Sequence, residues 1–265
     1  MTARPVVRRP GPSRKAWVMI GVISAVIAVL GAIATATLSY RVQARLKSRE
    51  HMDYMGRYRD ALLWAAFDLQ SRIYNILRGF DDSRRPGGKG VLQAFLVEGT
   101  DRQANYFKRS TAFVFAEFLG WIEIFRRDLQ FLDLGDSKTN RHTMFLLVTI
   151  SETLSAASTS ETECFRIFRT DQRALGELMI DPDSKPGERR CLGYAAFCSA
   201  LESGGASAEW IRELIDHVEL AAREPGMAQG RLARLQHQLI DMMDLLDPDG
   251  QRFPSKQRSR FASKG

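Results

Sequence analysis

Three arginines in the second half of the chain have the spacing of a binding site. Arg166, Arg169 and Arg173 follow one another at intervals of three and four residues. If this stretch is helical, their guanidinium groups share one face, because positions three and four apart are neighbours on a helix surface. Guanidinium groups placed together can hold a phosphate, a carboxylate or an acidic partner helix. The spacing therefore predicts a candidate site for an anionic ligand or partner.

The same spacing also fits an ordinary charged helix surface. Glu177 lies four residues after Arg173, and Asp171 lies two residues before it. Acids at these positions can pair with the arginines locally and leave no binding site. Both interpretations stay open. The acids Glu117, Glu123 and Glu177 would join a pocket at the arginines only if folding brings them together.

The residue types of catalytic and metal sites are present, but not at the spacing that such sites need. None of the four histidines lies in an H-E-x-x-H or H-x-x-x-H pattern or has a cysteine at ligand spacing. The segment 87–90 is glycine-rich, but Ser83 and Gly90 occupy the positions where a phosphate-binding loop needs Gly and Ser or Thr. The turn at 247–250 would place Leu245 at the first ligand position of a calcium loop. We therefore expect no catalytic residue, no metal and no cofactor, and an enzyme is the less favoured class.

The three cysteines do not form an obvious disulfide framework. Their number is odd, so at least one thiol has no partner within the chain. Cys191 and Cys198 are seven residues apart, which on a helix separates them by about 10 Å along the axis, beyond disulfide reach. Glu163 stands beside Cys164 and is expected to raise the pKa of its thiol, so a reactive thiolate is not expected. This pattern favours a reducing compartment.

Apolar residues recur every three or four positions along much of the chain, which predicts an all-α body. The expected helices cover about 40–80, 101–134, 138–157, 164–180, 191–201, 206–223 and 227–246, with a short helical piece at 91–97. The segment 101–134 is apolar over most of its circumference, as expected for a helix central to a core. No convincing strand pattern and no internal repeat is found. We predict a helical-bundle body of about seven helices over residues 41–250.

Residues 16–38 are a run of 23 residues without charge. As a helix the run would be about 34 Å long, enough to cross a hydrocarbon core of about 30 Å. A lone apolar segment satisfies its backbone in lipid only as a helix. Trp17 and Tyr40 stand near its ends, where aromatic rings prefer the headgroup level, and Arg41 follows. We predict an uncleaved transmembrane helix over residues 16–40.

A cleaved signal peptide is the alternative for this segment. Ala34, Thr35 and Ala36 fit an A-x-A cleavage pattern. The apolar run is longer than the usual signal core of about 7–15 residues, and the basic residues that follow oppose export. The anchor is therefore the favoured interpretation.

Small residues recur along the predicted anchor and would allow two such helices to approach closely. They include Gly21, Ala25, Ala28 and Ala32. A homodimer through this face is one interpretation. The other is that Ala and Gly are simply common in membrane helices.

The net charge of +7 is distributed unevenly. Residues 1–50 carry nine Lys/Arg and one acid, residues 251–265 carry five Lys/Arg and no acid, and residues 51–250 carry 24 Lys/Arg and 30 acids. The acidic body disfavours a nucleic-acid partner. Basic flanks can contact anionic lipid, at about 1 kcal/mol for each Lys or Arg. We expect residues 1–15 and 251–265 to be disordered basic tails.

The orientation of the anchor is nearly balanced. Five Lys/Arg precede the uncharged run and four to six follow it, so the positive-inside rule does not decide. The cysteine pattern favours a body on the cytoplasmic side. We therefore expect a plasma (inner) membrane location, with a single span and the body facing the cytoplasm.

Three segments carry a resemblance to known proteins. Residues 58–63 (YRDALL), 120–126 (GWIEIFR) and 165–179, which contains the arginine trio, resemble a group of uncharacterised bacterial membrane-anchored all-helical proteins of unknown function. The resemblance spans most of residues 51–253. It implies a bacterial source and one helical architecture behind an anchor, and it adds no catalytic residue.

Together these features predict a single-pass, membrane-anchored helical scaffold or regulatory protein that acts on an unknown protein partner. The alternative is a membrane-tethered sensor or enzyme that binds an anionic ligand near Arg166, Arg169 and Arg173. Buried, unpaired acids and arginines around a cavity would favour the alternative. Arginines paired one by one at the surface would favour the scaffold.

Overall fold

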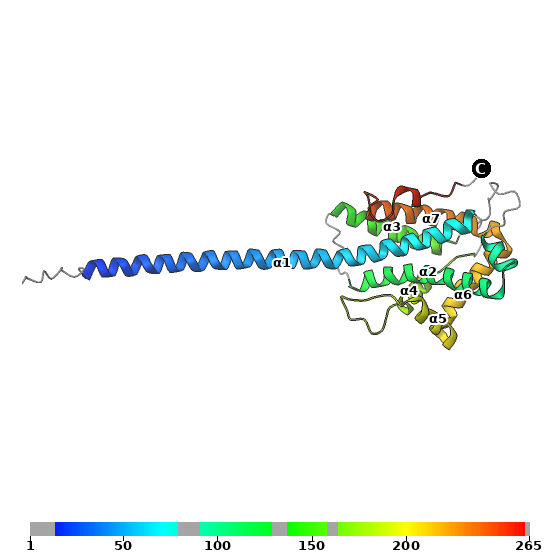
Figure 1. Ribbon diagram of the computed structural model, residues 1–265, viewed down its shortest axis with the longest axis horizontal. Helices are drawn as coiled ribbons and strands as arrows, with labels where there is room; N and C mark the ends of the chain where they lie inside the picture. The colour runs from blue at the N-terminus through cyan, green and yellow to red at the C-terminus, as the bar shows by residue number, and fades with distance from the viewer. Residues whose placement is uncertain (1–13, 79–90, 129–136, 158–163, 263–265) are drawn as a thin grey trace, which may run out of the picture. The chain divides into compact units, whose positions relative to one another are not determined.

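The computed structural model describes residues 14–78, 91–128, 137–157 and 164–262, which are helical with connecting turns (Figure 1). The elements are α1 (Arg14–Arg78), the π-helix η1 (Gln93–Val97), α2 (Asp101–Asp128), α3 (Ser137–Ser155), α4 (Arg169–Leu178), α5 (Tyr194–Ser203), α6 (Ala206–Arg223), α7 (Pro225–Leu246) and the 3-10 helix η2 (Ser255–Gln257). Within these ranges no strand occurs, and the one extended pairing is a bridge between Ile180 and Cys191. The predicted all-α class is confirmed.

The chain divides into two compact units, residues 1–54 and residues 55–265. The first unit contains the beginning of α1, and the second contains the remainder of α1 and all later elements. The predicted body, residues 41–250, therefore differs from the observed unit at both ends.

In the part of the chain that the structure describes, no helix is both long and apolar enough to cross a membrane. The backbone of α1 is helical throughout the predicted anchor, but many of the anchor's side chains are not described. The side chains that are not described include Trp17 and residues 20–29. Gly21, Ala25 and Ala28 fall within that range. Residues 1–13 of the tail predicted at 1–15 and the glycine-rich segment at 87–90 also lie outside the described residues, whereas Arg14 and Lys15 belong to α1.

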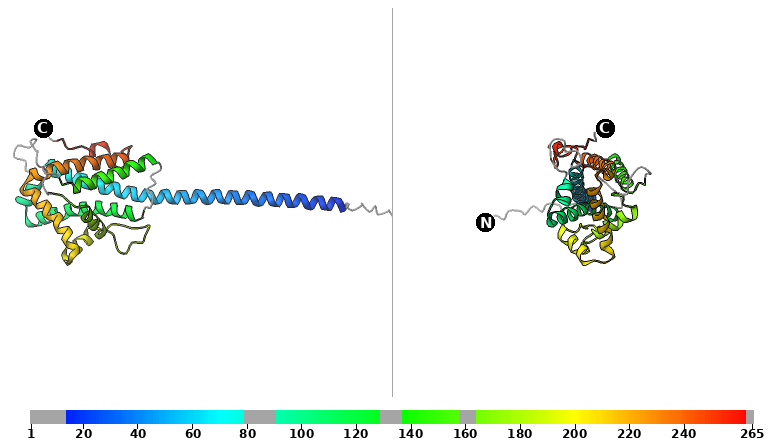
Figure 2. Two further views of the ribbon diagram at one scale, coloured as in Figure 1. Left: turned by 180° about the vertical axis from the view of Figure 1, so that it is seen from behind. Right: turned by 90° about the vertical axis from the view of Figure 1, so that its right-hand side faces the viewer.

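The last third of α1 is the central helix of the unit 55–265. Its completely buried side chains recur every three or four residues: Leu62, Ala66, Leu69, Ile73 and Ile76. On one side the Tyr58 hydroxyl donates to Asp128 of α2 over 2.8 Å. On another side the Gln236 amide of α7 donates to the Gln70 side chain over 3.2 Å. The end-on view in Figure 2 shows the other helices arranged around it.

A close contact between α2 and α4 depends on two glycines. A Cβ atom on Gly176 of α4 would lie 2.7 Å from the Leu119 carbonyl oxygen and 2.8 Å from the Cβ of Glu123. A Cβ atom on Gly120 of α2 would lie 2.7 Å from the Cβ of Met179. Any larger residue at either position would push the helices apart, so glycine permits this approach.

The helices α3 and α7 form a second packed pair, held by a buried arginine. Arg231 of α7 is 2% exposed. Its guanidinium donates to the carbonyl oxygens of Thr153, Leu154 and Ala156 over 2.6, 3.3 and 3.0 Å. These carbonyls lie at the C-terminal end of α3, where intrahelical donors run out and the helix dipole is negative. The end of α3 therefore compensates the buried positive charge.

The helix predicted over residues 164–180 begins later than expected, at Arg169. Phe165 has a φ of 55°, a left-handed conformation that a helix cannot contain. Its ring is fully buried and stacks on Phe115 at a centroid distance of 5.1 Å. Burial of this ring outweighs the local helical preference, since the helical periodicity alone does not show which side chains the core takes up. Arg166 consequently does not share a helix with the other two arginines.

The other predicted helices agree with the structure where it describes them. The prediction over 206–223 matches α6, and those over 138–157 and 227–246 match α3 and α7 to within two residues at each end. The helix predicted over 101–134 corresponds to α2, and its last residues lie outside the described ranges. The helix predicted over 191–201 is shifted to α5.

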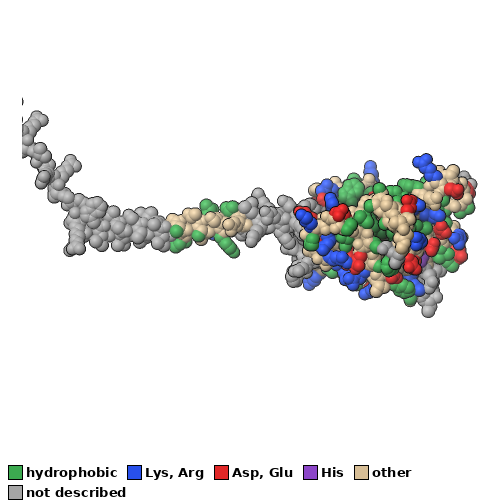
Figure 3. Space-filling model, turned by 90° about the horizontal axis from the view of Figure 1, so that it is seen from below, with side chains coloured by type: hydrophobic (Ala, Val, Ile, Leu, Met, Phe, Trp, Pro, Cys, Tyr) green, Lys and Arg blue, Asp and Glu red, His purple; other side chains and the backbone are tan. Residues whose placement is uncertain are grey.

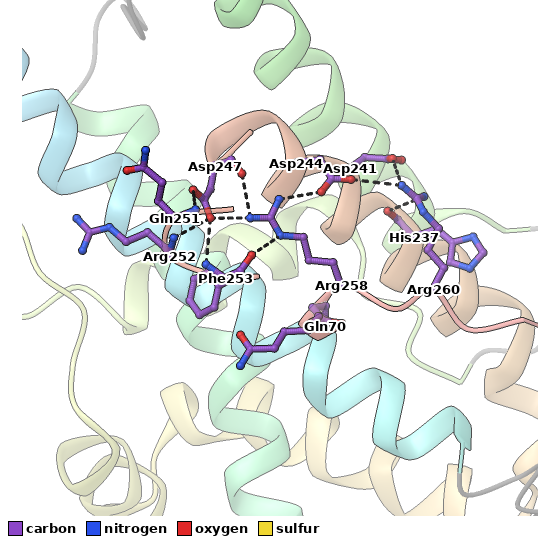
Figure 4. A network of polar contacts seen from close by, with 11 residues as sticks. Gln70, His237, Asp241, Asp244, Asp247, Gln251, Arg252, Phe253, Arg258 and Arg260 are labelled. Atoms are coloured by element: carbon purple, nitrogen blue, oxygen red, sulfur yellow. Dashed lines mark hydrogen bonds and ion pairs between the residues drawn. The ribbon is translucent and has the colours of Figure 1, made fainter. Parts of the chain in front are cut away.

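The C-terminal residues pack on the unit, so the prediction of a disordered tail is wrong for residues 251–262, named here the C-terminal strap. Asp247 at the end of α7 is its main polar attachment (Figure 4). Its carboxylate accepts the backbone N–H groups of Gln251, Arg252 and Phe253 over 2.9, 3.1 and 3.0 Å. Arg258 adds an ion pair to the same carboxylate at 2.6 Å.

Further contacts tie the strap to α1 and α7. The Phe253 ring stacks on Phe67 of α1 at 4.1 Å between centroids. The buried Gln236 amide donates to the Ser259 carbonyl over 2.9 Å and accepts the Phe261 N–H over 3.1 Å. Arg260 pairs with Asp241 at 2.7 Å. The basic charges of the strap thus neutralise acids of α7, an arrangement between distant segments that local sequence patterns do not encode.

The charge state of Asp247 makes this attachment sensitive to acid. Burial alone would raise its pKa, but the three backbone N–H donors and Arg258 outweigh burial and hold the pKa below its usual value. A carboxyl with a lowered folded-state pKa stabilises the protein above its unfolded pKa, and this stabilisation is lost as the pH falls through the folded value. The strap attachment should therefore weaken at acidic pH.

Substitution Arg258→Met is expected to lower the free energy of unfolding by about 2–4 kcal/mol, because it leaves the Asp247 carboxylate buried without its cation. The Arg258 and Asp247 side chains are 8% and 7% exposed. Urea denaturation of the full-length chain measures the effect, with Lys256→Met at an exposed strap position as the control. Equal effects of the two substitutions at neutral pH would contradict this role of the ion pair.

Candidate functional site

A groove with a volume of about 390 Å³ lies between α2, α3 and α4 and is named here the α2–α3–α4 groove. Its apolar wall includes Leu119, Ile122, Met144, Leu147, Val148 and Ile150. Its charged lining consists of Glu123, Arg126, Arg169 and Arg173. The groove therefore combines an apolar floor with a rim of mainly positive charge.

A single carboxylate organises the arginines at this rim. The Glu123 side chain is 4% exposed. It pairs with Arg127 at 2.8 Å, with Arg126 at 3.3 Å and, more distantly, with Arg173 at 3.7 Å. Arg127 also pairs with Glu177 at 2.8 Å. Because one buried acid serves three guanidinium groups, an excess of positive charge faces the groove.

The arginine trio that the sequence predicts as a site is divided in the structure. Arg169 and Arg173 line the groove, whereas Arg166 lies before the helix with its guanidinium 5.0 Å from the centre of the Phe168 ring. Arg169 pairs with Glu152 at 3.0 Å, and both side chains are exposed. The two groove arginines are thus at the surface, each against one carboxylate.

Of the three acids considered with the trio, the fold brings only Glu123 into the lining of the groove, where it contacts Arg126 and Arg173. Glu177 pairs with Arg127 outside that lining, and Glu117 lies with Asp68 of α1. Burial raises the pKa of Glu117 to about 7, and the negative charge of Asp68 adds to the increase. Glu117 therefore belongs to the α1–α2 contact.

Sequence reasoning missed two parts of this site. Arg126 and Arg127 lie in the last turn of α2, where basic residues are common because they complement the helix dipole. Their position alone therefore carried no signal of a site. The exposed apolar face of α3 was also missed, because periodicity shows that a helix has an apolar face but not which part of that face other helices leave uncovered.

Large apolar side chains are exposed on the elements that flank the groove. On α3, Met144, Phe145 and Val148 are 47%, 65% and 47% exposed, and Phe168 before α4 is 49% exposed. The face of the unit shown in Figure 3 carries a mixture of basic, acidic and apolar side chains. Exposed apolar side chains that line a groove, as Met144 and Val148 do, are typical of a binding surface.

Other reactive groups do not converge on the groove. Among the described residues no group of three or more His, Cys, Asp or Glu side chains has the arrangement of a metal site. The three cysteines are free thiols. Burial raises the pKa of Cys164 to about 12, in agreement with the expectation that its thiol is unreactive. His237 lies 2.8 Å from the Phe261 carbonyl oxygen and belongs to the strap attachment.

The fold and the groove together define the class of this chain as an all-α protein with an arginine-rimmed apolar groove on its second unit. Comparison of the chain with protein-family models, with curated proteins and with solved structures finds no match in any of the three.

Substitution Glu117→Gln is expected to stabilise the protein at alkaline pH. The folded-state pKa of Glu117 is raised from 4.5 to about 7, so the folded protein resists ionisation of this carboxyl. The free energy of unfolding of the wild type therefore decreases as the pH rises through that range. Glutamine carries no charge at any pH, so the variant should exceed the wild type by about 1–3 kcal/mol above pH 7 and equal it at acidic pH.

The measurement is urea denaturation of the full-length chain as a function of pH. Glu188→Gln, at an exposed loop position, is the matched control and should show no such pH dependence. A difference between Glu117→Gln and the wild type that stays constant with pH would sink this interpretation.

Proposed function

We propose that this chain is a single-pass, membrane-anchored scaffold or regulatory protein that binds a protein partner in the α2–α3–α4 groove. The observation that carries the proposal is a groove lined by the exposed apolar side chains Met144 and Val148 together with the arginines Arg169 and Arg173. Aromatic residues, Met and Arg are the types enriched at protein–protein interfaces. The pairing of the arginines at the surface also supports a docking role.

The proposed anchor is residues 16–40, and two features of α1 support it. Among its described side chains, Leu30, Ile33 and Leu38 are apolar and exposed. The Thr35 and Thr37 hydroxyls donate to carbonyl oxygens four residues earlier, over 2.8 and 2.9 Å. Hydroxyls satisfied within their own helix are compatible with lipid, where water does not reach them.

We further propose a bacterial inner-membrane location with the body on the cytoplasmic side. Exposed Tyr40 and Arg41 would lie at the headgroup level, and basic residues near the anchor would contact anionic lipid. The spacing of the small residues Gly21, Ala25, Ala28 and Ala32 in the sequence would allow two anchors to associate.

The second candidate is a tethered sensor or enzyme that binds a small anion in the same groove. Arg126, Arg169 and Arg173 favour it, because each guanidinium has more N–H donors than its single carboxylate contact uses. The groove lining is otherwise mainly apolar, and exposed apolar side chains continue beyond it. A small anion would leave this surface uncovered, so a protein partner is the better fit.

The proposed topology predicts the behaviour of two fusions after Gly265. Alkaline phosphatase, which is active only outside the cytoplasm, should be inactive, and a fluorescent protein that folds only inside should be bright. Both fusions should sediment with the membranes. Active phosphatase with a dark fluorescent fusion would place the body outside, and recovery of both in the soluble fraction would refute the anchor.

The proposed docking site predicts position-specific cross-linking in living cells. A photoreactive amino acid at Val148, inside the groove, should give a discrete protein adduct, whereas the same amino acid at exposed Lys256 should not. The substitutions Arg169→Glu and Arg173→Glu should decrease the Val148 adduct, because they reverse the charge of the rim. An absent adduct, or one that charge reversal leaves unchanged, would contradict docking in the groove.

A further inference from the structure

An acidic surface on this chain has the charge opposite to that of the groove. On α6, Glu209, Glu213 and Asp216 are exposed and follow one another at intervals of four and three residues, so they share one helix face. The negative charge of Asp171, on the neighbouring helix α4, repels that of Glu213 and raises its pKa. These four residues are named here the acidic ridge. No ion pair neutralises them among the described residues.

The members of the ridge repel one another. Burial raises the pKa of Glu213, and the charges of Asp171, Asp216 and Glu209 raise it further. A cation placed against the ridge would relieve this repulsion. Arg212 lies on the same helix and is exposed, but it offsets one charge of four. The ridge therefore keeps a net negative charge towards solvent.

The arginines of the groove have the complementary charge and the same spacing. Arg169 and Arg173 are four residues apart on α4, as Glu209 and Glu213 are on α6. Four helical residues correspond to a rise of about 6 Å on both helices. Two helices laid side by side can therefore bring each carboxylate to a guanidinium. The arginine side chains are 61% and 53% exposed, so they are accessible to such a partner.

We propose that the partner of the α2–α3–α4 groove is a second copy of this chain, whose acidic ridge lies against the arginines of the first. This inference rests on the proposed function, since it names the occupant of the same groove. The described residues supply both surfaces, each with charge that its own ion pairs leave uncompensated. The contact would also cover exposed apolar side chains of α3.

The arrangement of the helices allows a closed dimer. The helix α4 packs against α3 on the groove side and against α6 on the ridge side. The two surfaces therefore flank one helix, with Arg173 towards the groove and Asp171 towards the ridge. A two-fold axis near α4 would place the groove of each copy on the ridge of the other. Such an isologous contact is the commonest form of homodimer.

Charge reversal provides the test, performed on the full-length chain in detergent micelles by sedimentation. The groove variant carries Arg169→Glu and Arg173→Glu, and the ridge variant carries Glu209→Arg and Glu213→Arg. Each variant alone should dimerise at least about tenfold more weakly than the wild type, because like charges then face each other. A mixture of the two variants should restore the dimer, because each reversed surface then meets a surface of opposite charge.

Two controls separate this contact from other effects. The pair Lys185→Glu and Glu188→Arg, on the loop before α5, should leave the dimer unchanged. All substituted side chains are exposed, so unfolding midpoints should stay close to that of the wild type. Raising the salt concentration should weaken the wild-type dimer, since exposed charges are screened.

The inference is overturned if the single variants dimerise like the wild type, or if mixing them restores nothing. The cross-link at Val148 distinguishes this failure from failure of the proposed function. An adduct to a different protein, insensitive to reversal of the ridge, would keep the docking groove and refute the second copy as its occupant. No adduct at Val148 would refute both.

Discussion

The close approach of α2 and α4 is the constraint on which the site depends. Gly120 and Gly176 leave no room for a side chain where the two helices touch. Because the backbones are so near, Glu123 of α2 reaches the guanidinium group of Arg173 on α4 while it remains buried. The same contact places Arg169 and Arg173 at the edge of a surface whose other side is α3. A wider helix spacing would separate Glu123 from Arg173 and open the groove.

Buried polar groups that hydrogen-bond to distant segments hold the rest of the unit together. Arg231 neutralises the carbonyl end of α3, the Gln236 amide bonds to Gln70 and the strap, and Asp247 accepts three backbone N–H groups. Buried polar groups without partners would cost more than their bonds contribute, so each of these contacts requires its counterpart to be in place. This requirement couples the C-terminal strap to α1 and α7 and explains why a strongly basic segment is part of the folded unit.

A membrane anchor would lower the affinity that the proposed contact between two copies needs. Two copies confined to one bilayer meet at a high effective concentration, so an interface that is weak in solution can be populated. Exposed ion pairs contribute little individually and are screened by salt. The proposed contact between the arginines of the groove and the acidic ridge would therefore contribute more to the specificity of association than to its affinity. Burial of the exposed apolar side chains of α3 in the contact would supply the affinity that the ion pairs do not.

Much of the architecture follows from the sequence itself. The spacing of apolar residues determined the all-α class and the course of α2, α3, α6 and α7, since one buried stripe is a local property of a helix. The sequence also determined the uncharged run at 16–38. Only the tertiary structure decided that Phe165 leaves the helical path, that Arg166 separates from Arg169, and that residues 251–262 pack on α7. Each of these outcomes depends on which distant groups meet, because burial and ion pairing act through space, whereas periodicity describes only neighbours along the chain.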